Sequence, residues 1–273
     1  MERLVFNEAP DRTELTGVVI GDVHGPLAVL SHGSAMRFCQ RSYVDIGHEL
    51  ADRGVSLLSG ETRGHDIAAL HRRGDDFVGG GGAFERFDES VRDCDAWLRY
   101  AHDAGAAQVI AMGHSMGGTK TVLALSAGAA ADALVLLSPA VSWPANAERI
   151  AIARDMIDKG RGNDLMPPRT DAPPWNLISA ATLAQRFDLI ESVFASPGGP
   201  WSRIDIPTLV LFGAGEDDVD SDLDALTSAR ASGQRLDCRV IDNADHEFRG
   251  AEARVADVVA EWLSDVLAPV PTL

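Results

Sequence analysis

The stretch QVIAMGHSMGG (residues 108–118) decides the fold of this chain and carries its strongest chemical motif. Its first half is an apolar run of strand length, and a helical pattern follows it over residues 118–126. Between them, Gly-His-Ser-Met-Gly fits the pattern G-x-S-x-G, in which a serine lies on a sharp turn between a strand and a helix. Gly113 and Gly117 flank Ser115 because a Cβ atom at either position would collide with neighbouring backbone. The pattern therefore predicts Ser115 as a nucleophile, beside a helix N-terminus that favours a developing oxyanion.

A serine nucleophile of this kind needs an acid and a base further along the chain, in the order Ser, acid, His. Of the eight histidines, His246 is the one that lies downstream of Ser115. It stands in the segment DNADHEF (residues 242–248), directly after the last predicted strand. We therefore expect His246 to be the general base.

The acid is expected after the penultimate strand, where the segment GAGEDD (residues 213–218) presents three consecutive carboxylates. The acid must accept a hydrogen bond from His246 Nδ1–H and stabilise the imidazolium. A count from Pro207 without a gap selects Glu216, a turn that is one residue longer selects Asp217, and GEDD taken as a local motif selects Asp218. The sequence leaves these three alternatives open.

Two backbone N–H groups are expected to form an oxyanion hole. One is the amide of Met116, immediately after the nucleophile. The other belongs to the turn after His32-Gly33, at Ser34 or one residue further at Ala35. The proposed chemistry calls for no organic cofactor and no metal ion.

Short apolar runs that end in Gly, Ser, Asp or Asn recur along the chain and alternate with helical patterns, which predicts an α/β fold with a mostly parallel sheet. A small antiparallel hairpin is expected near the N-terminus, from residues 4–6 and 17–20. One amphipathic stripe between residues 84 and 101 predicts a helix, and similar patterns occur over 36–53 and 252–267. The runs predicted as parallel strands are 27–30, 55–58, 108–112, 133–137, 208–212 and 238–241.

Residues 141–206 interrupt this alternation, because they contain no convincing strand. Asn146 is a candidate N-cap for one helix, and a second helix is predicted to open near Ser179. We interpret 141–206 as a helical cap inserted into an α/β core formed by 1–140 and 207–273; the alternative is an irregular excursion on the side of the domain. Trp143, Trp175 and Trp201 fall within the insertion. They either line an apolar pocket for an acyl substrate or attach the cap to the core.

The composition fits a globular protein, with 45% hydrophobic and 24% charged residues in 273. The net charge of −17 disfavours nucleic acid and anionic membranes as partners. The three cysteines are far apart, which suits a reducing cytoplasm, and the N-terminus has no apolar core of a signal peptide. A homodimer is left open.

These motifs together resemble the α/β-hydrolases. The resemblance covers most of the chain and is carried by His32-Gly33, by RGHD at 63–66, by the motif at 113–118, by the carboxylates at 216–218 and by His246. The middle also resembles a poorly characterised branch in which a cap helix leads into a Gly-x-x-Asp-Leu-Met-Pro-like stretch, here at 162–167. A departure is the glycine run at 79–82, which we expect to form a mobile loop.

The resemblance implies a serine hydrolase that cleaves a carboxylic ester, thioester or lactone through an acyl-enzyme intermediate. Its expected substrate is a small, apolar acyl compound. Two other enzyme classes on the same fold remain as alternatives: an acyltransferase, and a cofactor-free lyase or peroxidase. A non-catalytic receptor that uses a hydrolase pocket for a small molecule is the alternative outside enzymes.

Overall fold

The computed structural model describes residues 1–142, 146–168, 177–194, 198–230 and 233–267. An eight-stranded sheet runs through it in the order β1-β2-β4-β3-β7-β8-β9-β10. Strand β2 pairs antiparallel with both β1 and β4, and all other neighbours are parallel. The strands are β1 (Glu2–Glu8), β2 (Glu14–Ile20), β3 (Pro26–Ser31), β4 (Ser56–Gly60), β7 (Gln108–His114), β8 (Ala133–Leu137), β9 (Thr208–Gly213) and β10 (Leu236–Ile241).

Helices cover both faces of this sheet, which is why its central strands are almost entirely buried. Helices α1 (Arg41–Ala51) and α7 (Glu252–Val266) pack their apolar stripes on one face. Helices α2 (Phe87–Asp103), α3 (Met116–Ser126) and α6 (Val219–Ser228) pack on the other. The predicted α/β class, the six parallel strands and the N-terminal hairpin are therefore confirmed.

Helix α1 begins later than predicted, at Arg41 rather than near Met36, because the backbone first turns at Met36, whose amide bonds the Gly33 carbonyl. Helix α6 has no counterpart among the predicted helices. Val219, Leu223 and Leu226 have the spacing of a short apolar stripe and pack against the core, but acidic residues stand between them and the stripe was not recognised.

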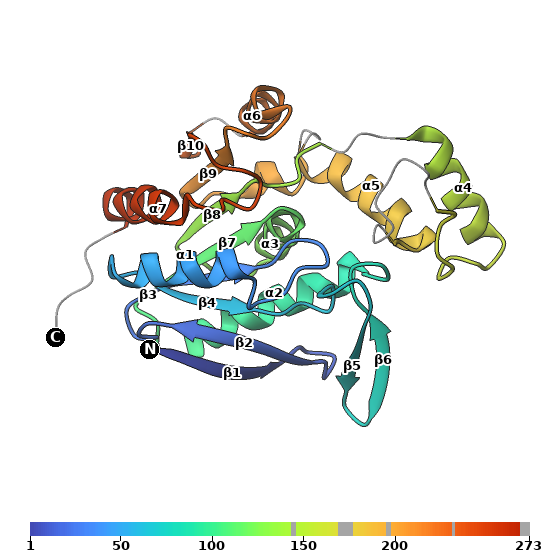
Figure 1. Cartoon of the computed structure of the whole chain (residues 1–273), viewed down its shortest axis with the longest axis horizontal. Coiled ribbons are helices and arrows are strands. Elements are labelled where there is room, and N and C mark those ends of the chain that lie inside the picture. Colours follow the sequence, from blue (N-terminus) through green and yellow to red (C-terminus); the bar gives the residue numbers. More distant parts are fainter. Residues whose placement is uncertain (143–145, 169–176, 195–197, 231–232, 268–273) are drawn as a thin grey trace.

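The glycine run at 79–82 does not form the expected mobile loop. Gly79 and Gly80 end strand β6 (Asp76–Gly80), which pairs antiparallel with β5 (Ala69–Arg73) as a separate hairpin that projects from the lower edge of the molecule in Figure 1. The glycines allow close packing: a Cβ at Gly80 would lie 2.6 Å from the His71 ring, and one at Gly82 would lie 2.8 Å from Ala35 Cβ.

Two helices, α4 (Ala147–Asp158) and α5 (Ala180–Phe194), form the described part of the insertion together with the short 3₁₀ helix η1 (Trp201–Arg203). Asn146 Oδ1 accepts a hydrogen bond from the Arg149 amide, which confirms the predicted N-cap. Helices α4 and α5 share an apolar cluster of their own and extend to one side of the sheet in Figure 1. Trp143 and Trp175 lie outside the described residues.

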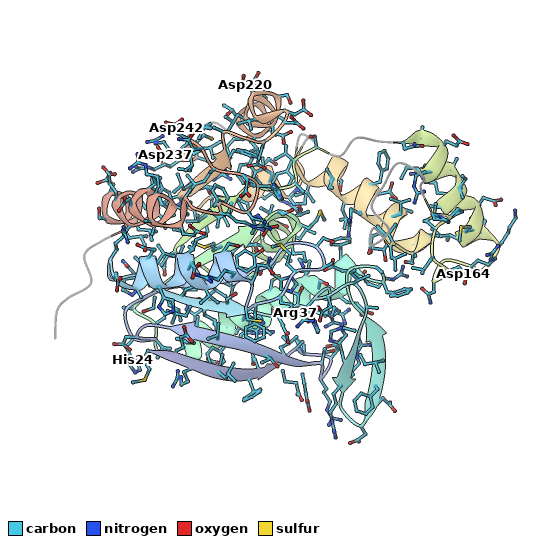
Figure 2. The ribbon with its side chains drawn as sticks, viewed as in Figure 1. His24, Arg37, Asp164, Asp220, Asp237 and Asp242 are labelled. Atoms are coloured by element: carbon cyan, nitrogen blue, oxygen red, sulfur yellow. The ribbon has the colours of Figure 1, made fainter. Side chains whose placement is uncertain are left out.

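The acidic excess is spread over the surface. Asp164, Asp220 and Asp242 are all exposed and lie on separate segments of the molecule in Figure 2. No helix among the described residues is long and apolar enough to cross a membrane.

Candidate active site

Five loops meet at one edge of the sheet, because parallel strands end at the same edge. They follow β3, β7, β8, β9 and β10, which are consecutive neighbours in the sheet. The predicted site residues Ser34, Ser115, Glu216 and His246 all stand in these loops, and so does Ser138, which was not predicted. This edge is therefore the candidate active site.

Ser115 occupies a strained turn between β7 and α3, with φ 52° and ψ −125°. Such a conformation is rare for a residue with a side chain and persists only where the surroundings enforce it. The flanking glycines are required sterically. A Cβ at Gly113 would lie 2.6 Å from Gly118 Cα, and one at Gly117 would lie 2.1 Å from the Ser31 carbonyl oxygen. Ser115 itself is partly exposed.

His246 contacts one of the three candidate carboxylates. Its Nδ1 lies 2.5 Å from Glu216 Oε2. The other carboxylate oxygen, Oε1, accepts hydrogen bonds from Ser138 Oγ at 2.6 Å and from the Gly213 amide at 2.7 Å. Burial raises the pKa of Glu216, but these three hydrogen bonds outweigh it and hold the pKa below its ordinary value. The Glu216 carboxylate is therefore ionised and oriented toward His246.

Asp217 and Asp218 are exposed, and the structure brings neither of them into contact with His246. Asp218 adopts a left-handed backbone conformation, with φ 59°, at the N-terminal end of α6. The chain thus makes the shortest of the three turns considered, in which the Gly213 amide bonds back to the Glu216 side chain.

The loop that carries His246 lies beside the turn at Ser115. His114, the residue before Ser115, has its Nε2 2.7 Å from the His246 carbonyl oxygen, and the centroids of the two rings are 5.0 Å apart. Although His246 follows the edge strand β10, its loop therefore returns to the end of the central strand β7.

The amides of Met116 and Ser34 donate no hydrogen bond to another described residue, whereas the Ala35 amide bonds the Gly64 carbonyl. His32 Nδ1 lies 2.7 Å from the Gly33 carbonyl oxygen. Because the C=O and N–H of a trans peptide point in opposite directions, this contact turns the Ser34 N–H away from His32. Of the two positions weighed after Gly33, Ser34 is thus the one whose amide is available to a ligand.

Sequence reasoning missed a cluster of buried charges behind this turn. Lys120 and Glu85 are fully buried, and Lys120 Nζ lies 3.0 Å from Glu85 Oε1 and 2.9 Å from Thr62 Oγ1. The Thr62 amide donates to His32 Nε2, which leaves His32 Nδ1 to carry the proton. Arg186 of α5 is also buried and donates from Nη2 to Ser34 Oγ at 2.7 Å. Charged side chains normally indicate surface, so no sequence pattern pointed to this cluster.

Within the described part of the chain, no group of His, Cys, Asp and Glu is arranged to hold a metal ion. Trp201 is fully buried, donates to the Leu226 carbonyl and packs against Phe194. Of the two roles considered for the insertion's tryptophans, Trp201 therefore has the packing role.

The sheet order, the covering helices and the strained serine turn are those of the α/β-hydrolase fold. The family model described as serine aminopeptidase, S33, matches residues 26–159, just under half of the chain. That range contains Ser34, Ser115 and Met116 but ends before Glu216 and His246.

Solved structures agree with this fold over nearly the whole chain. Est1E from Butyrivibrio proteoclasticus, with ferulic acid bound, is 18% identical with a TM-score of 0.68, covering 97% of this chain and 100% of its own. The α/β hydrolase GrgF from Penicillium sp. sh18 is 14% identical with a TM-score of 0.75, covering 98% and 100%. A soluble variant of monoglyceride lipase from Saccharomyces cerevisiae is 14% identical with a TM-score of 0.72, covering 98% and 96%. No curated protein sequence matches the chain.

Proposed function

We propose that this protein hydrolyses a carboxylic ester through an acyl-enzyme on Ser115, with His246 as general base and Glu216 as the triad acid. The observation that carries the proposal is the 2.5 Å contact between His246 Nδ1 and Glu216 Oε2, beside a strained serine turn. A carboxylate at Nδ1 keeps the proton there and leaves Nε2 free to accept one from a serine hydroxyl.

In the proposed reaction, Ser115 Oγ attacks the acyl carbonyl carbon while His246 Nε2 takes the hydroxyl proton. The amides of Met116 and Ser34 bind the oxyanion of the tetrahedral intermediate. The C–O bond to the leaving alcohol then breaks, and His246 returns the proton to the alkoxide oxygen. A water molecule, deprotonated by His246, attacks the acyl-enzyme, and the acid is released with Ser115 regenerated.

Residues 141–206 act as a cap over this site in our proposal, with 1–140 and 207–273 as the core. Support comes from α5, which approaches the nucleophile side of the sheet directly. Ile190 packs with Met116 and Phe87, and Arg186 bonds the side chain of Ser34. The same helix is tied to the start of α2, where Gln185 Oε1 accepts from the Phe87 amide.

The substrate we propose has an uncharged, apolar acyl group. Phe87, Met116 and Ile190 form a buried apolar cluster next to the nucleophile. The net charge of −17 opposes an anionic substrate at long range. Solved structures of this fold include Est1E with ferulic acid bound, a monoglyceride lipase and a dienelactone hydrolase, so esters come first in the substrate panel and lactones stay in it.

The experiment that tests the proposal is reaction with a fluorophosphonate, read by intact mass, followed by assay on a panel of esters, thioesters and lactones. Wild type is expected to gain a single adduct and Ser115→Ala none, with a loss in kcat/KM of roughly 10⁴-fold or more. Ser126→Ala is the matched control and should behave as wild type, because Ser126 lies at the C-terminal end of α3, the helix that Ser115 precedes. An unreactive wild type, or a fully active Ser115→Ala, would contradict the proposal.

A further inference from the structure

Two buried side chains bridge the turn at Gly33 and the loop at His246. Tyr43 lies on α1 and His114 is the last residue of β7; each is 1% exposed. The Gly33 amide lies 3.1 Å from Tyr43 Oη, Tyr43 Oη lies 2.8 Å from His114 Nδ1, and His114 Nε2 lies 2.7 Å from the His246 carbonyl oxygen. One chain of three hydrogen bonds therefore passes behind Ser115.

The chemistry of the groups decides which atom donates in each of these three hydrogen bonds. A carbonyl oxygen only accepts, so His114 Nε2 carries the ring proton and donates to His246. A neutral imidazole has one N–H, so Nδ1 accepts and Tyr43 Oη–H donates to it. The Gly33 amide then donates to the Tyr43 oxygen. Met36 Sδ also lies 3.0 Å from Tyr43 Oη, but a thioether is a much weaker acceptor than an imidazole nitrogen.

The side chains of Tyr43 and His114 both stay uncharged at neutral pH. Burial, together with the neighbouring His246, lowers the pKa of His114 to about 4. Burial keeps the Tyr43 hydroxyl protonated by raising its pKa. The site is also packed closely: a Cβ at Gly33 would lie 3.2 Å from His114 Nδ1 and 3.3 Å from Ser115 Cβ.

We infer that Tyr43 and His114 are positioning residues. They hold the turn at Gly33-Ser34 and the loop that carries His246 at fixed places around Ser115. The inference rests on the proposed function. His246 needs such support because its side chain is 49% exposed, and Glu216 restrains its ring but not its backbone. Gly33 immediately precedes Ser34, so the tether on its amide also limits where the Ser34 N–H can point. A displacement of about 1 Å in either element can cost roughly 100-fold in rate.

A double-mutant cycle tests this. Tyr43→Phe removes the central donor, and His114→Asn keeps an acceptor near Tyr43 but is too short to reach the His246 carbonyl. Each change is expected to lower kcat about 10–100-fold with KM within about 2-fold of wild type, and to slow fluorophosphonate labelling in proportion. The double variant should be no more than about 2-fold worse than the worse single variant, because either change alone breaks the bridge. Tyr100→Phe and His102→Asn are the matched controls, expected to leave kcat unchanged.

Additive losses that follow the fall in Tm, or unchanged kcat in folded single variants, would overturn the inference. If the wild type itself does not react with the fluorophosphonate, the proposed function fails instead, so the two failures are distinguishable. Long-range ¹H–¹⁵N correlation of the His114 ring in wild type decides the matter even if the variants do not fold. A ring protonated at Nε2 and bare at Nδ1 from pH 6 to 8 is expected, and a proton on Nδ1 would overturn it.

Discussion

A single carboxylate, that of Glu216, accepts hydrogen bonds from three different segments of the chain. The donors are Ser138 after β8, the Gly213 amide at the end of β9, and His246 after β10. The first two donate to Oε1 and so orient the other oxygen, Oε2, toward His246. In contrast, Asp217 and Asp218 point from the exposed side of the same turn. The role of a carboxylate here is thus set by what surrounds it and not by its charge, which all three share.

We predict that Glu216→Gln lowers kcat by roughly 10³–10⁴-fold, because an amide N–H facing Nδ1 would favour the wrong tautomer of His246. Asp217→Asn and Asp218→Asn remove the same charge from the same turn, and asparagine tolerates the left-handed conformation at 218. They are expected to stay within about 2-fold of wild type. Steady-state kinetics of the three variants on one ester gives the answer. A large loss in either Asp variant, with Glu216→Gln active, would show that the aspartate, and not Glu216, is the triad acid.

At the scale of elements, helix α3 follows the turn of the candidate nucleophile Ser115 and carries one member of a buried ion pair. Ser115 stands at its N-terminus, and Lys120 lies little more than one turn further along, where it is fully enclosed with Glu85. One oxygen of Glu85, Oε2, has no hydrogen-bond partner among the described residues. The pair is therefore a costly feature that needs both members, since each one neutralises the other in a dry environment.

We predict that Lys120→Met lowers the free energy of unfolding by about 3–5 kcal/mol, because it removes the cation that bonds the buried Glu85 carboxylate directly and leaves only the longer-range charge of Arg186. The double variant Lys120→Met/Glu85→Gln should recover at least half of that loss. Lys159→Met is the control, since Lys159 pairs with Asp155 on an exposed helix face and should change stability by less than about 0.5 kcal/mol. Urea unfolding measures all three. If the double variant were no more stable than Lys120→Met, the ion pair would not explain the loss.

At the scale of the whole molecule, two histidines near the candidate nucleophile Ser115, His32 and His114, are fully buried. Burial lowers the pKa of His32 to about 3 and that of His114 to about 4, and nearby positive charge adds to the effect. Both are neutral in the folded protein, whereas in the unfolded chain they take up protons near pH 6.5. The folded state thus binds fewer protons than the unfolded state in the range between these values.

We therefore predict that the free energy of unfolding is fully maintained above about pH 6.5 and falls as the pH drops toward 4. His32 and His114 should give a slope that approaches 3 kcal/mol per pH unit and should lower the stability by about 3–4 kcal/mol between pH 7 and pH 5. His71, whose pKa burial also lowers to about 4, should add about half as much again. Urea unfolding at pH 7, 6 and 5 in 0.5 M salt, which screens the acidic surface, measures this. Equal stability at pH 7 and pH 5 would show that the two rings are not neutral in the folded state.

Much of this protein was predictable from local sequence. The parallel strands are continuous apolar runs because both faces of the sheet are covered, and the serine turn follows from steric limits on Gly113 and Gly117. The N-cap of α4 needed only Asn146. Each of these features depends on residues close together in the sequence, so a local sequence pattern is enough to predict it.

What only the tertiary structure decided depends on contacts between distant segments. The choice of Glu216 as the partner of His246 depends on the length of one turn and on the position of Ser138 in the loop after another strand. Lys120 is buried because Glu85, from a distant segment, lies beside it. The hydrogen bonds from Gly33 to His246 join four segments of the chain. Hydrogen bonds and charges satisfy one another in space with no fixed spacing along the chain, and for that reason no periodicity in the sequence records them.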